Sequence, residues 1–279
     1  MSALRVGTRG SALAIAQARW VTERIEEATE LVTITTDGDR DRAAGDKSRW
    51  TGALEVALQH GEIDLAVHSA KDVPGDLGEG LALVAAPARE SWADVLVGVA
   101  TLDDLPAGAR VGTSALRRRA QLLAVRPDLE LIELRGNVDT RLRKLAEGEA
   151  DALVLARAGL ARLGLEPEGA DLEGELFVPA PGQGVLALQA RAGDDRVRAA
   201  TAELDDPATA ACLDTERAVA RALGASCHTA VGIHADGRTI RGFAGRPDGS
   251  AWILDEVDDG DGDALAARML AAGAAEMLA

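Results

Sequence analysis

The sequence of 279 residues predicts an α/β protein: two similar α/β domains with a cleft between them, plus a small C-terminal α+β domain. Short apolar runs alternate with helical segments before Asp205, which is typical of sheets covered by helices. Two sequence landmarks occur twice in the same order, which indicates a duplicated domain. From Asp205 onward the pattern changes to a long helix, three short strands and a closing helix.

The first domain begins with a predicted strand at Leu4–Gly7, where an apolar run leads into small and hydroxyl residues. An Ala-rich helix is then predicted from Ala12 to about Ala28. Runs bounded by Gly, Pro or Asp predict the other elements: a strand at Leu31–Thr36, a polar loop at Asp37–Arg49, a helix at Ala53–His60, and strands at Ile63–Val67 and Leu81–Ala85.

The second domain repeats this plan. Arg110–Thr113 has the same four residues as Arg5–Thr8, and Gly148–Val154 resembles Gly61–Val67. Short repeats arise by chance in a chain rich in Ala, Leu and Gly, but the shared order favours duplication. The strands of this domain are predicted at Val95–Val99, Leu129–Leu134 and Leu153–Leu155.

The segment Pro179–Gly184 contains two prolines and two glycines, which is typical of a stiff hinge. The strand that follows, Val185–Gln189, is predicted to rejoin the first domain. We therefore expect domain 1 at residues 1–87 and 184–204, domain 2 at residues 92–180 and domain 3 at residues 205–279.

The third domain is predicted to contain a helix at Thr209–Leu223, a loop of small residues at Gly224–Thr229, and three strands. Asp236-Gly237 and Pro247-Asp248-Gly249 are hairpin turns between the strands. An Ala-rich helix at about Gly262–Leu278 is predicted to close the chain.

Composition excludes several classes of function. The formal charge of −16 argues against nucleic-acid and membrane binding, because phosphate surfaces would repel the protein. Two cysteines do not form a disulfide scaffold in a chain of this length. No leader peptide and no run of about 18 apolar residues is visible, so we expect a soluble, cytoplasmic protein.

A candidate catalytic group lies in His68–Pro74, directly after the apolar run Ile63–Val67. Ligands of α/β sheets collect beyond the carboxyl ends of the strands, and this is where Lys71 and Asp72 fall. Neighbouring residues of a strand point to opposite sides, so only one of the two need face a ligand. Asp72 is the candidate, because a carboxylate transfers protons and stabilises a developing cation. The alternative is an exposed Lys-Asp pair in a turn.

Arginines gather at strand ends and helix starts. Cations near a helix N-terminus are disfavoured by the helix dipole, so a ligand with several anionic groups would explain the placement. The alternative is pairing with the abundant Asp and Glu residues. The arginines concerned are Arg9, Arg117, Arg118, Arg135, Arg141, Arg157 and Arg162.

Cys227 lies in a loop of small residues, where a thiol is accessible as a nucleophile. The alternative is an inert cysteine, which would suit Cys212 within its predicted helix. The four histidines show no ligand spacing, so no metal site is predicted.

Together these segments resemble porphobilinogen deaminase, also called hydroxymethylbilane synthase, over nearly the whole chain. The resemblance is carried by several long motifs in the order of that family. These are Thr8–Ala14 with Gln17, Ala66–Pro74, Gly112–Arg118, Leu134–Leu142, Ala158–Gly164, Pro179–Gly184 and the Cys227 loop. The fold implied is that of two periplasmic-binding-protein-like domains with a third, small domain.

The resemblance implies a transferase of heme and tetrapyrrole biosynthesis. A dipyrromethane cofactor is attached to Cys227 by a thioether, and four porphobilinogen molecules are added to it head to tail with loss of ammonia. Hydrolysis then releases hydroxymethylbilane. Each pyrrole ring bears an acetate and a propionate, which would account for the arginines. The enzyme is expected to act as a monomer.

The resemblance also assigns residues. Asp72 is implied as the catalytic acid and base. The cofactor is implied to contact Cys227, Lys71, Thr113, Ser114, Arg117, Arg118, Arg135, Asn137 and Gln183. Substrate is implied to contact Arg9, Ser11, Gln17, Arg141, Arg162, Lys47 and Trp50.

The chain departs from the family pattern at four places. The loop before Trp50 is short, Gly52 replaces a familiar lysine, Ala115 replaces a serine, and Ala230 replaces a proline. These changes bear on loop closure and rate more than on the type of reaction. A two-lobed binding protein for an anionic metabolite is the alternative function, but it has no use for Cys227 or for a third domain.

Overall fold

The computed structural model describes residues 2–36, 48–226 and 228–278, with the backbone alone for residues 48–50. The chain divides into two compact units. The first comprises Met1–Glu90 with Gly184–Ala211, and the second comprises Ser91–Gln183 with Cys212–Ala279. The α/β class is confirmed, whereas a separate third domain at residues 205–279 stays a prediction.

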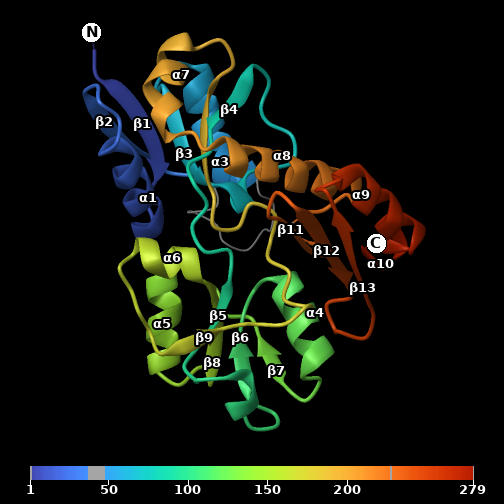
Figure 1. Cartoon of the computed structure of the whole chain (residues 1–279). Helices are drawn as coiled ribbons and strands as arrows, with labels where there is room; N and C mark the ends of the chain where they lie inside the picture. Colours follow the sequence, from blue (N-terminus) through green and yellow to red (C-terminus); the bar gives the residue numbers. More distant parts are fainter. Residues whose placement is uncertain (1, 37–47, 227, 279) are drawn as a thin grey trace. The chain divides into compact units, whose positions relative to one another are not determined.

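The first unit is built on a five-stranded sheet in the order β2-β1-β3-β10-β4. β1, β2 and β3 are parallel, and β10 is antiparallel to both of its neighbours. The strands are β1 (Leu4–Arg9), β2 (Thr29–Ile34), β3 (Leu65–Ser69), β4 (Leu81–Ala85) and β10 (Leu186–Arg191). The helices are α1 (Ala12–Thr22), α3 (Ser48–Gln59), α7 (Asp195–Thr201) and the short 3-10 turns η1 (Ala70–Asp72) and η3 (Ala202–Leu204) (Figure 1).

The second unit contains a five-stranded sheet in the order β7-β6-β8-β5-β9. Its strands are β5 (Asp94–Val97), β6 (Arg110–Gly112), β7 (Glu130–Ile132), β8 (Ala152–Ala156) and β9 (Gly169–Asp171). Its helices are η2 (Leu102–Asp104), α4 (Leu116–Val125), α5 (Val138–Ala146) and α6 (Arg157–Arg162). The parallel strands β7, β6 and β8 take the places that β2, β1 and β3 take in the first sheet.

The predicted duplication is confirmed at the level of register. Val6 pairs with Leu65 across β1 and β3, and Val111 pairs with Ala152 across β6 and β8. In both copies an arginine precedes the first residue of the pair and an aspartate precedes the second: Arg5 and Asp64 in one copy, Arg110 and Asp151 in the other. The Arg5 amide donates to Asp64 Oδ2 at 3.0 Å, and the Arg110 amide donates to Asp151 Oδ2 at 2.7 Å. The two sheets thus share strand order, register and the ion pair at the strand starts.

Glycine is required at the same place in both copies. A Cβ on Gly7 would fall 2.3 Å from Ile63 Cδ1, and a Cβ on Gly112 would fall 2.3 Å from Leu134 Cδ1. Such distances are far below van der Waals contact, so a larger residue would force these core side chains apart. The repeated glycine therefore reflects close packing in each sheet.

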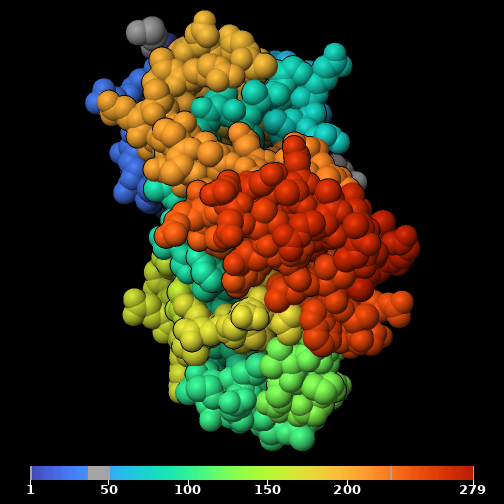
Figure 2. Space-filling model, turned by 45° about the vertical axis from the view of Figure 1, so that its right-hand side comes forward, coloured from blue at the N-terminus to red at the C-terminus, as the bar shows by residue number. Residues whose placement is uncertain are grey.

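The C-terminal segment forms a three-stranded antiparallel sheet in the order β11-β12-β13. Val219, Leu265 and Met269 belong to one apolar core with this sheet, and Phe243 packs with Ala120 of α4 in another. Figure 2 shows this segment as one continuous orange-to-red area. Its elements are α8 (Pro207–Ala222), β11 (Ala230–Ala235), β12 (Thr239–Gly245), β13 (Trp252–Asp258), α9 (Gly262–Ala271) and α10 (Ala274–Leu278).

Three predicted helices have different bounds in the structure. The helix expected at Ala12–Ala28 ends at Thr22, which allows Ile25 to pack into the first core and β2 to start at Thr29. The single closing helix is instead α9 and α10, because Gly273 between them adopts a left-handed φ of 94° that ends the first helix. The helix expected from Ala53 already begins at Ser48. Most of the predicted polar loop at Asp37–Arg49 lies outside the described residues.

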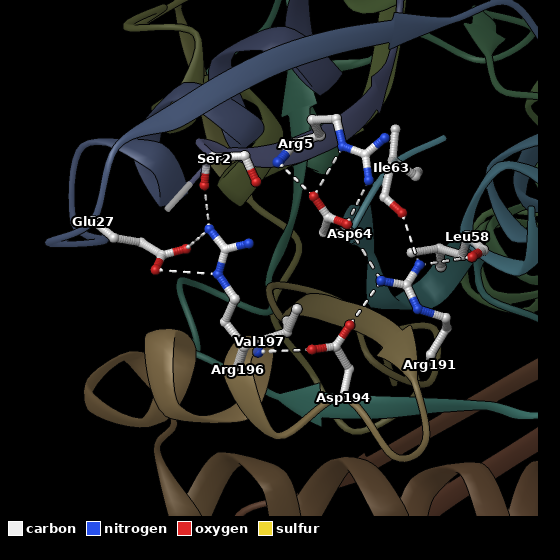
Figure 3. A network of polar contacts seen from close by, with 10 residues as sticks. All are labelled: Ser2, Arg5, Glu27, Leu58, Ile63, Asp64, Arg191, Asp194, Arg196 and Val197. Atoms are coloured by element: carbon white, nitrogen blue, oxygen red, sulfur yellow. Dashed lines mark hydrogen bonds and ion pairs between the residues drawn. The ribbon is translucent and has the colours of Figure 1, made fainter. Parts of the chain in front are cut away.

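The two copies of the Arg-Asp pair differ in burial, and this gives a stability prediction. Asp64 accepts from Arg5 Nε at 3.0 Å and Nη2 at 2.8 Å, and Arg191 Nη2 lies 3.3 Å away (Figure 3). Its side chain is 12% exposed, against 43% for Asp151. We expect Asp64→Ala to lower the free energy of unfolding by about 1–3 kcal/mol, since the Arg5 amide and two half-buried guanidinium groups lose a nearly buried acceptor.

The matched variant Asp151→Ala is expected to cost less than about 1 kcal/mol, because its ion pair is exposed to water. Urea unfolding of both variants at neutral pH measures the difference. Equal losses of unfolding free energy in the two variants would mean that burial of the Arg-Asp pair does not decide how much it stabilises the fold.

Candidate active site

One pocket of the first unit lies where β1 and β3 end. It is lined by Arg9, Ser11, Leu13, Ala14, Gln17, Thr51, Val67, His68, Ser69 and Asp72. β1 and β3 are parallel, so their carboxyl ends meet at the same edge of the sheet. Arg9 is the last residue of β1, and Ser69 is the last residue of β3. Four of the predicted site residues are therefore brought together here: Arg9, Ser11, Gln17 and Asp72.

Asp72 reaches this pocket because β3 passes directly into the 3-10 turn η1. The turn is closed by the Val73 amide, which donates to Ala70 O at 3.1 Å. Pro74 follows at once, which fixes the exit of the chain. Of the Lys71-Asp72 pair, Asp72 lines the pocket, and Lys71 occupies the same turn. The strand-end carboxylate is thus held by backbone geometry rather than by a flexible loop.

Ser11 and Gln17 hold α1 at the pocket. Ser11 is the N-cap of α1, and its hydroxyl accepts from the Ala14 amide at 3.3 Å. Gln17 is buried, and its Nε2 donates to Ser69 Oγ at 2.8 Å. The start of α1 therefore offers amide groups and a hydroxyl beside the Arg9 guanidinium, an arrangement suited to an anionic ligand group.

His68 is a buried member of the pocket wall that the sequence analysis did not assign to the site. Its Nε2 lies 2.9 Å from Gln189 Oε1. Burial lowers the pKa of His68 to about 4, while the hydrogen bond to Gln189 and the charges of Glu55 and Asp72 raise it only in part. The imidazole is therefore neutral at neutral pH.

A second cluster of predicted site residues lies in the second unit around Asp94. Arg117 Nη2 lies 2.8 Å from Asp94 Oδ2, and Arg118 Nη2 lies 2.7 Å from Asp94 Oδ1. Gln183 Nε2 donates to the same Oδ1 at 2.8 Å and to Trp92 O at 2.8 Å. All four side chains are buried. The alternative that arginines pair with internal carboxylates thus applies to Arg117 and Arg118.

The charges of this cluster perturb one another. Burial alone would raise the pKa of Asp94, but the guanidinium groups of Arg117 and Arg118 outweigh it and hold that pKa well below its usual range. Burial also lowers the pKa of Arg117, and the charge of Asp94 opposes this. One carboxylate faces two guanidinium groups, so the cluster carries a surplus positive charge.

Other predicted residues occupy the strand ends and helix starts of the second unit. Arg135 pairs with Glu133 at 2.7 Å, and Arg141 Nε donates to Gly136 O at 2.8 Å. Thr113 is buried, and its Oγ1 accepts from the Ala115 amide at 3.2 Å. The remaining positions are Ser114 before α4, Asn137 at the N-cap of α5, Arg157 paired with Asp171, and Arg162 at the end of α6.

Lys47 and Cys227 lie outside the described residues, and for Trp50 the structure gives only its backbone within α3. Sequence reasoning missed Thr51, Asp94, Glu55 and Gln189. Thr51 lines the pocket and is buried, and its Oγ1 has no hydrogen-bond partner among the described residues. Asp94 could have been found from the sequence. It directly precedes the apolar run Val95–Val99, and a carboxylate beside a buried strand needs a charged or hydrogen-bonding partner.

The described residues contain neither a metal-binding cluster nor a membrane-spanning helix. Across residues 2–36, 48–226 and 228–278, no group of His, Cys, Asp and Glu side chains is arranged to hold a metal ion. Within the same ranges, every helix is too short or too polar to cross a membrane.

Comparison with known proteins decides the family. Residues 4–199 match the family model described as porphobilinogen deaminase, dipyrromethane cofactor binding domain. The chain belongs to the porphobilinogen deaminase family. It is 45% identical to the porphobilinogen deaminase of Roseiflexus castenholzii, over 100% of this chain and 99% of that protein. It is also 45% identical to the porphobilinogen deaminase of Rubrobacter xylanophilus, over 99% of this chain and 96% of that protein.

Among solved structures, the chain is similar to an ABC transporter protein from Parabacteroides distasonis. The TM-score is 0.46 with 15% identity, over 78% of this chain and 74% of that chain. The porphobilinogen deaminase assignment rests on the sequence matches, and the fold rests on the strand order of the two sheets.

Proposed function

We propose that this member of the porphobilinogen deaminase family acts as a hydroxymethylbilane synthase, with Asp72 as its catalytic acid and base. The enzyme condenses four porphobilinogen molecules head to tail with loss of ammonia and then releases hydroxymethylbilane by hydrolysis. The observation that carries the proposal is that Asp72, Arg9, Ser11 and Gln17 line one pocket. Porphobilinogen has an aminomethyl group and two carboxylates, so it needs an anionic group and cationic groups in one site.

Asp72 is proposed to handle both charge and protons. In each condensation the aminomethyl C–N bond breaks, ammonia leaves, a new C–C bond forms and a ring proton is lost. A carboxylate beside the amine stabilises its ammonium form, stabilises positive charge on the pyrrole ring and accepts the ring proton. Arg9 and the capped start of α1 are proposed to hold a substrate carboxylate and so to orient the ring.

The dipyrromethane cofactor fits the residues of the second unit. Arg117 and Arg118 share a single buried carboxylate, so the surplus charge suits an additional carboxylate from a ligand. When bound, the dipyrromethane supplies the terminal pyrrole carbon to which the first porphobilinogen is joined. We propose that the chain holds it through Cys227 (as a thioether), Lys71, Thr113, Ser114, Arg117, Arg118, Arg135, Asn137 and Gln183.

The other proposed substrate contacts are Arg141, Arg162, Lys47 and Trp50. A formal charge of −16 disfavours nucleic-acid and membrane partners, so the proposed partner is porphobilinogen alone. We also propose a cytoplasmic monomer with three domains, of which the third, at residues 205–279, carries Cys227.

Mass spectrometry of the intact protein tests the proposal. The purified chain is expected to carry the mass of two linked pyrrole units, because the cofactor is covalent. Cys227→Ser should remove that mass, while the matched variant Cys212→Ser should keep it, since Cys212 lies within α8. Incubation with porphobilinogen should then give heavier enzyme-bound species and free linear tetrapyrrole. A chain without added mass and without product would contradict the proposal and favour the binding-protein alternative.

A further inference from the structure

Three hydrogen-bonded polar side chains form a string through the first unit to the wall of the Asp72 pocket: Glu55, Gln189 and His68. Gln189 Nε2 donates to Glu55 Oε1 at 2.7 Å, and Gln189 Oε1 lies 2.9 Å from His68 Nε2. Glu55 Oε1 also accepts from the Gly78 amide at 3.2 Å. Gln189 is fully buried and His68 nearly so. These residues belong to α3, β10 and β3, so the string ties three elements together behind the pocket.

The order of hydrogen-bond donors and acceptors in this string fixes the tautomer of His68. The Glu55 carboxylate only accepts, so it takes the amide N–H of Gln189. The amide oxygen of Gln189 is thereby turned toward His68, and a carbonyl oxygen also only accepts. His68 must therefore donate from Nε2, which leaves Nδ1 without a proton in the neutral ring.

The charged groups around His68 come from three elements. Glu55 lies on α3, Asp72 lies in η1 and Arg9 ends β1, while β10 presents the neutral Gln189. A proton on Nδ1 would create an imidazolium in the same pocket wall as the Asp72 carboxylate. That cation would attract Asp72 and compete with the cationic amine of a substrate.

We propose that Glu55 and Gln189 are positioning residues: Glu55 orients the Gln189 amide, and this uncharged amide binds the Nε2–H tautomer of the buried His68, so that the ring stays neutral and the negative charge of Asp72 stays available to the substrate amine. This inference rests on the proposed function for its substrate, but the tautomer itself does not. Burial disfavours the charged ring, and the Gln189 amide gives Nε2 an acceptor without the full negative charge of a carboxylate, so no competing cation forms in the pocket wall.

The tautomer is measured on the unmodified protein by ¹⁵N NMR of its four imidazole rings. Removing His60, His228 and His234 one at a time by His→Gln identifies the His68 signals by elimination. We expect a protonated Nε2 and an unprotonated Nδ1 for His68 between about pH 5 and 8. A ring protonated at Nδ1, or charged in this range, overturns the proposal whether or not the enzyme turns over porphobilinogen.

The variant Gln189→Glu tests the effect on catalysis. A carboxylate beside Nε2 favours the imidazolium, so the acidic limb of the kcat/KM profile should move to higher pH by about 1 unit or more. Activity should recover toward that of the unmodified enzyme above the new limb. Gln59→Glu is the matched control, because Gln59 is exposed on α3, the helix that carries Glu55, and this variant should leave the limb in place. If His68 becomes charged in Gln189→Glu and the limb does not move, the proposed role is wrong.

Discussion

Asp72→Asn is expected to lower kcat for porphobilinogen consumption by about 10²–10⁴-fold, the range typical of a lost general acid or base. The amide has the shape of the carboxylate but neither accepts a proton nor carries the charge that stabilises a cation. Binding should change little, because Arg9, Ser11 and Gln17 still line the pocket. KM should therefore stay within a few-fold of its original value, and the loss should appear in kcat.

The matched control is Asp76→Asn. Asp76 follows four residues later and is exposed to solvent. Steady-state assays of both variants, together with rapid-quench detection of enzyme-bound species, separate binding from chemistry. If Asp72→Asn retained kcat, or if both variants lost it equally, Asp72 would not be the catalytic acid and base.

Much of the fold could be predicted because its signals are local. The apolar run ends at Val67, two residues before β3 ends, and Pro74 marks the exit, so the position of Asp72 just beyond a strand end followed from the sequence. Repetition added a second signal. Arg5 and Arg110 precede the same residues, and each meets an aspartate at the start of the third strand, Asp64 or Asp151. Two short motifs that recur in the same order were sufficient to predict two similar α/β domains.

The parts that could not be predicted depend on which distant groups meet. Arg117 and Arg118 were correctly identified as unusual at a helix start, but the sequence left two explanations open. Asp94 lies 23 residues before Arg117, and no local pattern connects the two. Gln189 and Glu55 are likewise joined only when β10 packs against β3 and α3. Tertiary pairing of this kind leaves no periodic trace in the sequence.

Asp94→Asn is expected to lower the free energy of unfolding by about 3–5 kcal/mol, because two buried guanidinium groups would lose the carboxylate that compensates them. Arg117, Arg118 and Gln183 all converge on Asp94, and among the described residues no second carboxylate pairs with either guanidinium group. Asp128→Asn is the matched control. Asp128 is exposed, and its partner Arg126 also donates to Leu102 O and Leu105 O, so the loss should be less than about 1 kcal/mol.

The loss of unfolding free energy in Asp94→Asn should depend on pH in a defined direction. The folded-state pKa of Asp94 is held below its usual value, so its stabilising contribution is complete above the unfolded-state pKa of about 3.9. It is lost as the pH falls through the lower, folded-state pKa. Urea unfolding should therefore give a constant difference in the free energy of unfolding between the unmodified protein and Asp94→Asn from about pH 8 to pH 5. This difference should narrow only below about pH 4. A difference that narrowed near neutral pH would mean that a different group neutralises Arg117 and Arg118, and the surplus charge proposed to attract the cofactor would have to be assigned elsewhere.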